Sequence, residues 1–498
     1  MTLRKTPILS KSRFLVGLQC HLRLWHQFYN PGLVSEISSG QQAIFDTGHE
    51  VGELATQLYP GGLLVEEDYL HHKEAIQTTQ AAMNDSEVPA IYEAAFLSGG
   101  VRIRVDILER LDDGRWNLIE VKSSTSVKEI HLPDVAIQYY VLHGSGFKIA
   151  RAGILHLNNQ YVYDGRQLDL EGLFLFADLT EKVMSLQPEV SLRLEDLKGM
   201  LVWADAPVIL PSRHCNRPYE CEFWKHCTRE MPEFWVLNLS GIGQDKLDDL
   251  AALNIQDIRD IPESFLLSRL QERIKTCVIN QEEYISPALE AELQNVAYPI
   301  HFLDFETVGL GIPRYPFTRP YQAIPFQWSN HILFDDGTIV HREYLCDEDK
   351  DPREEFSLSL LDVLGREGSI VTYTSYEEGI INGLAEELPE YSEKLHALLI
   401  RIKDLHKMIK RNYYHPGFNG SFSLKSVLPA ILPEMSYENL AIQEGQLAGL
   451  EYLKMVDPST SPEERDKIKK DLLTYCGQDT LAMLKIREEL LKRLNERI

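Results

Sequence analysis

Two strand-like segments that carry acidic side chains constrain the fold of this chain more than any other feature. One is the pair of runs in RIRVDILERLDDGRWNLIEVKSS, and the other is the run YPIHFLDFE. A buried strand rarely carries carboxylates unless a cation neutralises them. Strand-like and helical patterns occur around both segments, which predicts a mixed α/β fold with two acidic sites.

Length and charge narrow the class of protein. The 498 residues correspond to about two to four domains. No apolar run approaches the roughly 20 residues that cross a bilayer, and the start of the chain lacks the apolar segment of a secretory signal, so we expect a cytoplasmic protein without a membrane partner. The net charge of -25 argues against a protein that coats nucleic acid nonspecifically, although a nuclease needs only local basic patches.

The periodic patterns divide the chain into three parts. Residues 1–230 show a helix, three strands, a helix and a strand, which predicts one compact α/β unit. Residues 231–295 are polar and helical without a strand pattern, and we expect a helical connector there. Residues 296–498 begin with three strands, a helix and a fourth strand, and then become helical. No GxxxxGK[ST] loop occurs, which argues against an ATP-driven motor.

The first acidic segment carries the residue types that phosphodiester hydrolysis requires. Period-2 alternation puts Glu120 and Lys122 on one strand face, and Asp106 lies in the preceding strand. Two carboxylates can hold a divalent cation, and a lysine can orient or deprotonate water. The alternative is a surface hairpin with an exposed charged face. The upstream acid and the helical run PDVAIQYYVL that follows favour a hydrolytic site.

From about residue 10 to residue 227 the chain resembles the PD-(D/E)XK nucleases, in their RecB-like iron-sulfur branch. The resemblance implies a restriction-endonuclease-like fold in which Asp106 and Glu120 bind Mg²⁺ or Mn²⁺ and Lys122 assists the attacking water.

Two further positions match this branch. His49, in FDTGHEVGELA, matches its metal-binding histidine, although a lone histidine on a helix is often structural. Gln138 matches the glutamine of its QxxxY helix, but Leu142 stands where the tyrosine is expected. The resemblance therefore implies a role for Gln138 more than for a tyrosine.

The cysteines suggest a metal centre rather than disulfides, since a chain of this length has only seven. Cys215, Cys221 and Cys227 cluster after the nuclease core, and Cys20 precedes it. The CxxC pairs typical of zinc sites do not occur, whereas cuboidal clusters accept more varied spacings. The arrangement resembles that of the iron-sulfur RecB-like nucleases and implies a 4Fe-4S cluster, with zinc or unligated thiols as alternatives. The remaining cysteines are expected to be core thiols: Cys277, Cys346 and Cys476.

The connector contains one candidate DNA contact. Gly241 and Gly243 open an apolar-periodic helix and resemble a helix-hairpin-helix element, whose backbone amides can hold a DNA phosphate. The alternative is a simple turn, since three nearby aspartates would repel a phosphate.

The second acidic segment has partners far downstream. Asp304 and Glu306 are two residues apart in a strand and point to one face. Tyr475 and Asp479 fall at i and i+4 of the helical run LLTYCGQDTLAML. Between them, the segment VTYTSYEEGII presents Glu377 at a helix start. The alternative is a helical tyrosine and aspartate that hold no metal.

This pattern, from about residue 299 to residue 491, resembles the DEDD exonucleases of the YxxxD subclass. The resemblance implies a ribonuclease-H-like fold, and Tyr475 would orient the attacking water. Glu377 stands where aspartate is usual, and Asp404 is its rival or an additional site residue. Two Mg²⁺ or Mn²⁺ ions would be held by four acidic residues: Asp304, Glu306, Glu377 and Asp479.

A basic stretch surrounds Asp404 and precedes Tyr413 and Tyr414, which could stack on bases. The alternative is a solvated helix face with core tyrosines. The candidate nucleic-acid contacts in this stretch are Lys407, Lys410 and Arg411.

These patterns together predict a metal-dependent nuclease with two hydrolytic sites that acts on DNA, on single strands or ends, in repair, recombination or defence. One alternative is an RNA-processing exonuclease. Another is a DNA-binding scaffold with one inactive nuclease core that serves a helicase partner, although both acidic sets are complete.

Overall fold

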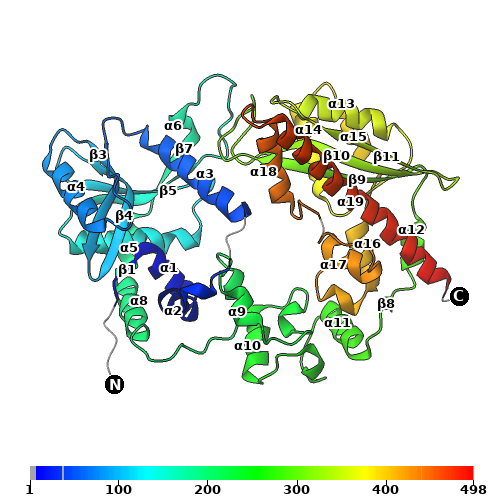
Figure 1. The fold of residues 1–498 in the computed structure, drawn as a ribbon, viewed down its shortest axis with the longest axis horizontal. Helices are drawn as coiled ribbons and strands as arrows, with labels where there is room; N and C mark the ends of the chain where they lie inside the picture. Colours follow the sequence, from blue (N-terminus) through cyan, green and yellow to red (C-terminus); the bar gives the residue numbers. More distant parts are fainter. Residues whose placement is uncertain (1–6, 36–38, 439, 497–498) are drawn as a thin grey trace. The chain divides into compact units, whose positions relative to one another are not determined.

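The computed structural model describes residues 7–35, 39–438 and 440–496. The chain has a mixed α/β, multidomain fold and divides into two compact units (Figure 1). The first unit comprises Met1–Glu230 and Leu310–Tyr321, and the second comprises Met231–Gly309 and Gln322–Ile498. The residues expected to form a separate connector thus cluster with the second unit. Within the described ranges, no helix is both long and apolar enough to span a bilayer.

The first unit is built on a seven-stranded sheet with the order β2-β3-β4-β5-β6-β7, in which β1 also pairs with β4. The neighbours β3, β4 and β5 are antiparallel, and β5 pairs in parallel with β6. The strands are β1 (Leu9–Ser10), β2 (Leu63–Leu64), β3 (Ala90–Ser98), β4 (Val101–Arg110), β5 (Trp116–Lys122), β6 (Ile149–Leu157) and β7 (Phe174–Asp178).

A buried helix, α5, connects the parallel strands β5 and β6 and contacts β3, β4 and β6. Its second residue is Pro133, which suits a helix start because proline lacks an N–H that the first turn leaves unpaired. The helices of this unit are α1 (Lys11–Gln19), α2 (His21–Tyr29), α3 (Ser39–Thr56), α4 (His72–Asn84), α5 (Leu132–Gly144), α6 (Leu170–Leu173), α7 (Thr180–Ser185), α8 (Gln187–Met200) and α9 (Trp224–Thr228).

The second unit contains a five-stranded sheet with the order β11-β10-β9-β12-β13. The pairs β11–β10 and β10–β9 are antiparallel, and β9–β12 and β12–β13 are parallel. The strands are β8 (Tyr284–Ile285), β9 (Ile300–Gly309), β10 (Ala323–Leu333), β11 (Ile339–Leu345), β12 (Ser369–Thr372), β13 (Ile402–Asp404) and β14 (Tyr413–Tyr414).

Side chains of β9 alternate between two helical layers. Leu303 and Phe305 pack into a core with residues of α13, α14 and α15, whereas Asp304 contacts Cys476 of α19. Figure 1 shows α19 running along the sheet. The helices are α10 (Gln244–Ala252), α11 (Arg269–Asn280), α12 (Leu289–Gln294), α13 (Arg353–Leu364), α14 (Tyr376–Glu387), α15 (Ser392–Leu399), α16 (Leu405–Asn412), α17 (Leu424–Ile431), α18 (Gly445–Val456) and α19 (Pro462–Asn495).

Two expectations about the second unit are wrong. The predicted connector was expected to lack strands, but its strand β8 pairs with β14. A two-residue strand has too little periodicity to be seen in a sequence, and its partner here is distant. The chain was also expected to be helical after its fourth strand, but a further strand, β13, ends at Asp404. Asp404 therefore lies between a strand and the helix α16.

Candidate active sites

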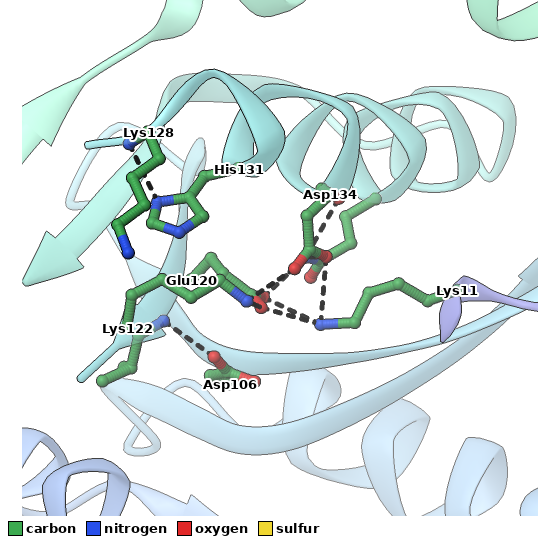
Figure 2. Close-up of polar contacts among 9 residues, drawn as sticks. Lys11, Asp106, Glu120, Lys122, Lys128, His131 and Asp134 are labelled. Atoms are coloured by element: carbon green, nitrogen blue, oxygen red, sulfur yellow. Dashed lines mark hydrogen bonds and ion pairs between the residues drawn. The ribbon is translucent and has the colours of Figure 1, made fainter. Parts of the chain in front are cut away.

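The first acidic cluster lies where β4, β5 and α5 meet in the first unit. Lys122 Nζ donates to Glu120 Oε1 at 2.7 Å and to Asp134 Oδ2 at 2.6 Å. Asp106 Oδ2 accepts the backbone N–H of Val121 at 2.7 Å. The structure therefore places all three predicted residues, Asp106, Glu120 and Lys122, in one cluster (Figure 2).

Two residues of this cluster, Lys11 and Asp134, were not predicted from the sequence. Lys11 Nζ, at the start of α1, lies 2.9 Å from both oxygens of Glu120 and 3.3 Å from Asp134 Oδ1. Figure 2 shows the ammonium groups of Lys11 and Lys122 approaching Glu120 from different elements. Lys11 is separated from Glu120 by 109 positions, so no local pattern reveals it. Asp134 precedes Gln138 by one helical turn, and that spacing was a usable signal.

Gln138 lies inside the cluster and is fully buried. Its Nε2 donates to Glu120 Oε2 at 2.6 Å and to Asp134 Oδ1 at 3.2 Å. Its Oε1 is buried without a hydrogen-bond partner among the described residues. A buried unpaired carbonyl oxygen beside carboxylates suits a bound cation or a water molecule. By contrast, Leu142 is buried in the apolar core.

His49 lies exposed on α3. Burial raises the pKa of the nearby Glu93, and His49 is among the groups that oppose this rise. Among the contacts of the described residues, none joins His49 to Asp106 or Glu120. The structure thus leaves the predicted histidine outside the direct contacts of the cluster.

Burial and charge set the protonation of this cluster. Burial, together with the charge of Glu120, raises the pKa of Asp106 to about 8. Burial would also raise the pKa of Glu120, but the charges of Lys11 and Lys122 outweigh it and lower that pKa. Burial would lower the pKa of Lys122, but Glu120 and Asp134 outweigh it and raise that pKa. Lys122 therefore stays protonated near neutral pH and suits orienting a water molecule more than deprotonating it.

The second acidic cluster lies between β9 and α19 in the second unit. Ligand atoms of Asp304, Glu306 and Cys476 all lie within 4.8 Å of one another. A pocket of about 360 Å³ is lined by Asp304 and Glu306 from β9 and by Tyr475 and Asp479 from α19. The i and i+4 positions of Tyr475 and Asp479 thus face the same pocket, as the helical period predicts.

Glu377 and Asp404 differ in what they contact. Glu377 lies in the first turn of α14, is 3% exposed, and has an Oε2 without a hydrogen-bond partner among the described residues. Burial, with the charges of Asp404 and Asp479, raises its pKa to about 7. Asp404 caps α16, where it accepts the N–H of Lys407 at 2.8 Å and pairs with Lys407 Nζ at 3.0 Å. Glu377 is therefore the acid with an unused oxygen.

Tyr437 and Lys425 complete the surroundings of Asp479. The Tyr437 hydroxyl donates to Asp479 Oδ1, and Lys425 Nζ lies 5.6 Å from the ring centre of Tyr475. Burial raises the pKa of Asp479 to about 6, although Tyr437 and Lys425 both oppose the rise. Neither residue has a sequence signal, because Tyr437 comes from the irregular region before α18 and Lys425, in the first turn of α17, is 54 positions from Asp479.

Cys476 was expected to be a core thiol, and it is fully buried. Its Sγ also donates to Asp304 Oδ2 at 3.5 Å, a contact that was not predicted. Its position in the helix between Tyr475 and Asp479 places it beside the acidic pocket. The other two expected core thiols, Cys277 and Cys346, are buried.

Four cysteines from the two ends of the first unit approach one another. Cys20 ends α1 and caps α2. The adjacent Gln19 Nε2 donates to the carbonyls of His214 at 2.8 Å and Tyr219 at 2.7 Å, which docks this turn on the loop of the other three cysteines. Burial raises the pKa of each thiol, and the charge of Cys20 adds to the rise at Cys215 and Cys227.

The remaining candidate nucleic-acid contacts are two glycines before α10 and three basic residues of α16. Gly241 has φ of +70°, and Gly243 precedes the first turn of α10. The basic candidates Lys407, Lys410 and Arg411 are exposed on α16.

Tyr413 and Tyr414 are fully buried in β14, so they are core residues and not a stacking platform.

Residues 301–423 match the family described as a domain of unknown function (DUF2779). None of the curated proteins compared with the chain matches it. The matched segment contains Asp304, Glu306 and Glu377, whereas Tyr475 and Asp479 lie beyond it.

Proposed function

We propose that this protein is a metal-dependent nuclease with two hydrolytic sites, one in each unit, acting on DNA ends or single strands. The observation that carries the proposal is that each unit gathers carboxylates from distant parts of the chain into one buried cluster. Buried carboxylates carry a high energetic cost unless they are paired or bind a cation. Metal-dependent phosphodiester hydrolysis uses such clusters.

In the first unit, Asp106, Glu120 and Asp134 would hold Mg²⁺ or Mn²⁺, whose preferred ligands are oxygens. The bound ion would polarise the scissile phosphate and activate water. The protonated Lys122, 2.7 Å from Glu120, can donate a hydrogen bond that fixes the attacking water or a phosphate oxygen. Gln138, on α5, donates a hydrogen bond to the Glu120 carboxylate and holds it in place.

In the second unit, four acidic residues would hold the ions: Asp304, Glu306, Glu377 and Asp479. Tyr475 lines the same pocket and would orient the attacking water. The strand order, three antiparallel strands followed by two parallel ones, supports the ribonuclease-H-like resemblance. By this resemblance the second site would release mononucleotides from a 3′ end.

The four cysteines would hold a 4Fe-4S cluster with a structural role. The cysteines are spaced along the chain without a CxxC pair, which favours the larger inorganic cluster over a single zinc ion.

Hydrolysis of RNA instead of DNA is the main alternative, because the proposed chemistry is the same for both backbones. A scaffold with one inactive nuclease core, serving a helicase, is the other. The completeness of both acidic clusters favours two active sites. Repair, recombination and defence are the processes that use such an enzyme.

End-labelled single-stranded and double-stranded DNA and RNA, incubated with the purified protein and Mg²⁺ or Mn²⁺, test this proposal. We expect DNA hydrolysis that is lost in the double variant Lys122→Ala/Asp304→Ala. Exclusive cleavage of RNA would favour the alternative substrate. Hydrolysis that persists in the double variant would overturn the assignment of at least one of the two sites.

A further inference from the structure

Lys11 places an ammonium group inside the acidic cluster of the first unit. It lies 2.9 Å from both oxygens of Glu120 and 3.3 Å from Asp134, with its side chain 18% exposed. We propose that Lys11 is a positioning residue that acts as a resident cation, so that this site takes one divalent ion and not two. The inference rests on the proposed metal site in the first unit.

The charges of the cluster support a single ion. Asp106, Glu120, Asp134 and the neighbouring Glu93 carry four negative charges when ionised, against two positive charges from Lys11 and Lys122. One divalent ion would balance these charges. A second ion would leave an excess of two positive charges and would lie close to two ammonium groups, which repel it.

The chain fixes Lys11 from the strand before it. Leu9 and Ser10 form β1, which pairs with Val101 and Arg102 of β4, the strand that carries Asp106. The Ser10 hydroxyl then caps α1 by accepting the N–H of Arg13 at 3.2 Å. Lys11 is therefore held in register with the catalytic sheet, unlike a lysine on a free surface.

Helix α1 also ties Lys11 to the cysteine site. Lys11 begins the helix and Cys20 follows its last residue, so the two lie about 14 Å apart along its axis. The helix packs closely on α8, because a Cβ added at Gly17 would lie 2.7 Å from Leu197. The helix is therefore held at its start by β1, along its length by α8 and at its end by the contact of Gln19 with the cysteine loop.

The test compares Lys11→Met and Lys11→Gln with the wild type, all in an Asp304→Ala/Asp479→Ala background that removes the second site. Both substitutions remove the charge, and Lys73→Met, an exposed lysine of α4, is the matched control. Mn²⁺ binding is measured by titration with detection of free Mn²⁺ by electron paramagnetic resonance. Single-turnover hydrolysis of labelled DNA is measured at saturating Mn²⁺.

We expect Mn²⁺ to bind about tenfold more tightly or with one additional ion in both Lys11 variants. We expect hydrolysis to be about tenfold slower or more, because loss of the Lys11 ammonium leaves the charges around the bound ion unbalanced. A residue with only a structural role would weaken both properties. Unchanged or weaker Mn²⁺ binding in both variants, with the visible absorbance of the first unit intact, would overturn the inference.

The outcome is separable from that of the proposed function. If the wild type hydrolyses no nucleic acid but both Lys11 variants bind Mn²⁺ more tightly, the nuclease assignment fails and the role of Lys11 stands. If the wild type hydrolyses DNA and the variants bind Mn²⁺ as it does, the nuclease assignment stands and the role of Lys11 fails.

Discussion

Tyr437 donates its hydroxyl hydrogen to Oδ1 of Asp479, a residue 42 positions further along the chain. The bond favours the ionised carboxylate, and it opposes the burial that raises the pKa of Asp479 to about 6. The irregular region before α18 thereby controls the charge of a candidate metal ligand on α19.

Replacing Tyr437 with phenylalanine should raise the pKa of Asp479 further. Because the metal requires the ionised carboxylate, the acidic limb of the exonuclease pH–rate profile should move upward, by about one pH unit or less. The profile is measured in a Lys122→Ala background, so that the first site is silent. An unmoved acidic limb would show that the bond does not act on the metal ligand.

Tyr475 is expected to orient water without holding the ions. Tyr475→Phe should slow the exonuclease by roughly one to three orders of magnitude while Mn²⁺ binding is kept. Asp479→Ala should remove the activity and weaken Mn²⁺ binding. The products on a 3′-labelled strand check the polarity, and digestion that starts only at 5′ ends would contradict the resemblance to the DEDD exonucleases.

The two sites should work independently, because they share no ligands and lie in separate units. Lys122→Ala should spare cleavage by the second unit, and Asp304→Ala should spare cleavage by the first. Each variant is assayed on the full substrate set. Loss of all cleavage from either single change would mean that there is one active site.

The protein should be brown when purified without oxygen, with broad absorbance near roughly 400 nm. Alanine at Cys20, Cys215, Cys221 or Cys227 should bleach the colour and lower the melting temperature of the first unit. Cys277→Ala, which removes a buried thiol of the second unit, is the control that should keep the colour. Stoichiometric zinc in a colourless anaerobic preparation would refute the iron assignment.

The metal-free protein should lose stability as the pH rises. Burial raises the pKa of Glu377 to about 7, of Asp479 to about 6 and of Asp106 to about 8. A carboxyl whose pKa is raised in the folded state binds more protons there than in the unfolded state. Its stabilising contribution is present below its unfolded pKa of about 4 and is lost as the pH passes through the raised value.

Thermal unfolding of the metal-free protein between about pH 5 and pH 8 checks this expectation. The melting temperature should fall across that range, and added Mn²⁺ should restore it most at the upper end, where the carboxylates are ionised. A melting temperature that rises with pH in the absence of metal would contradict the raised pKa values.

Local patterns predicted the parts of each site that lie on one element. Period-2 alternation grouped Glu120 with Lys122, and helical spacing grouped Tyr475 with Asp479. These pairs depend only on neighbouring residues, so one sequence is enough to place them.

The rest depends on contacts that no local pattern encodes. Lys11 reaches its cluster through the pairing of β1 with β4, and Tyr437 reaches Asp479 from an irregular region. Cys476 shared the apolar face of a helix and therefore resembled a core thiol, although it contacts Asp304. The short strands β8 and β13 exist because of their distant partners.

The alternation along β9 binds the chemistry of the second unit to its folding. Leu303 and Phe305 enter the apolar core, and the residues between and after them, Asp304 and Glu306, face α19. A slip or an insertion of one residue in this strand would exchange the two sets, burying both carboxylates among apolar helices and turning the aromatic ring toward the pocket. A one-residue shift of β9 would therefore remove its core packing together with its metal ligands. A variant that is inactive but well folded is expected from a point substitution in β9 and not from such a shift.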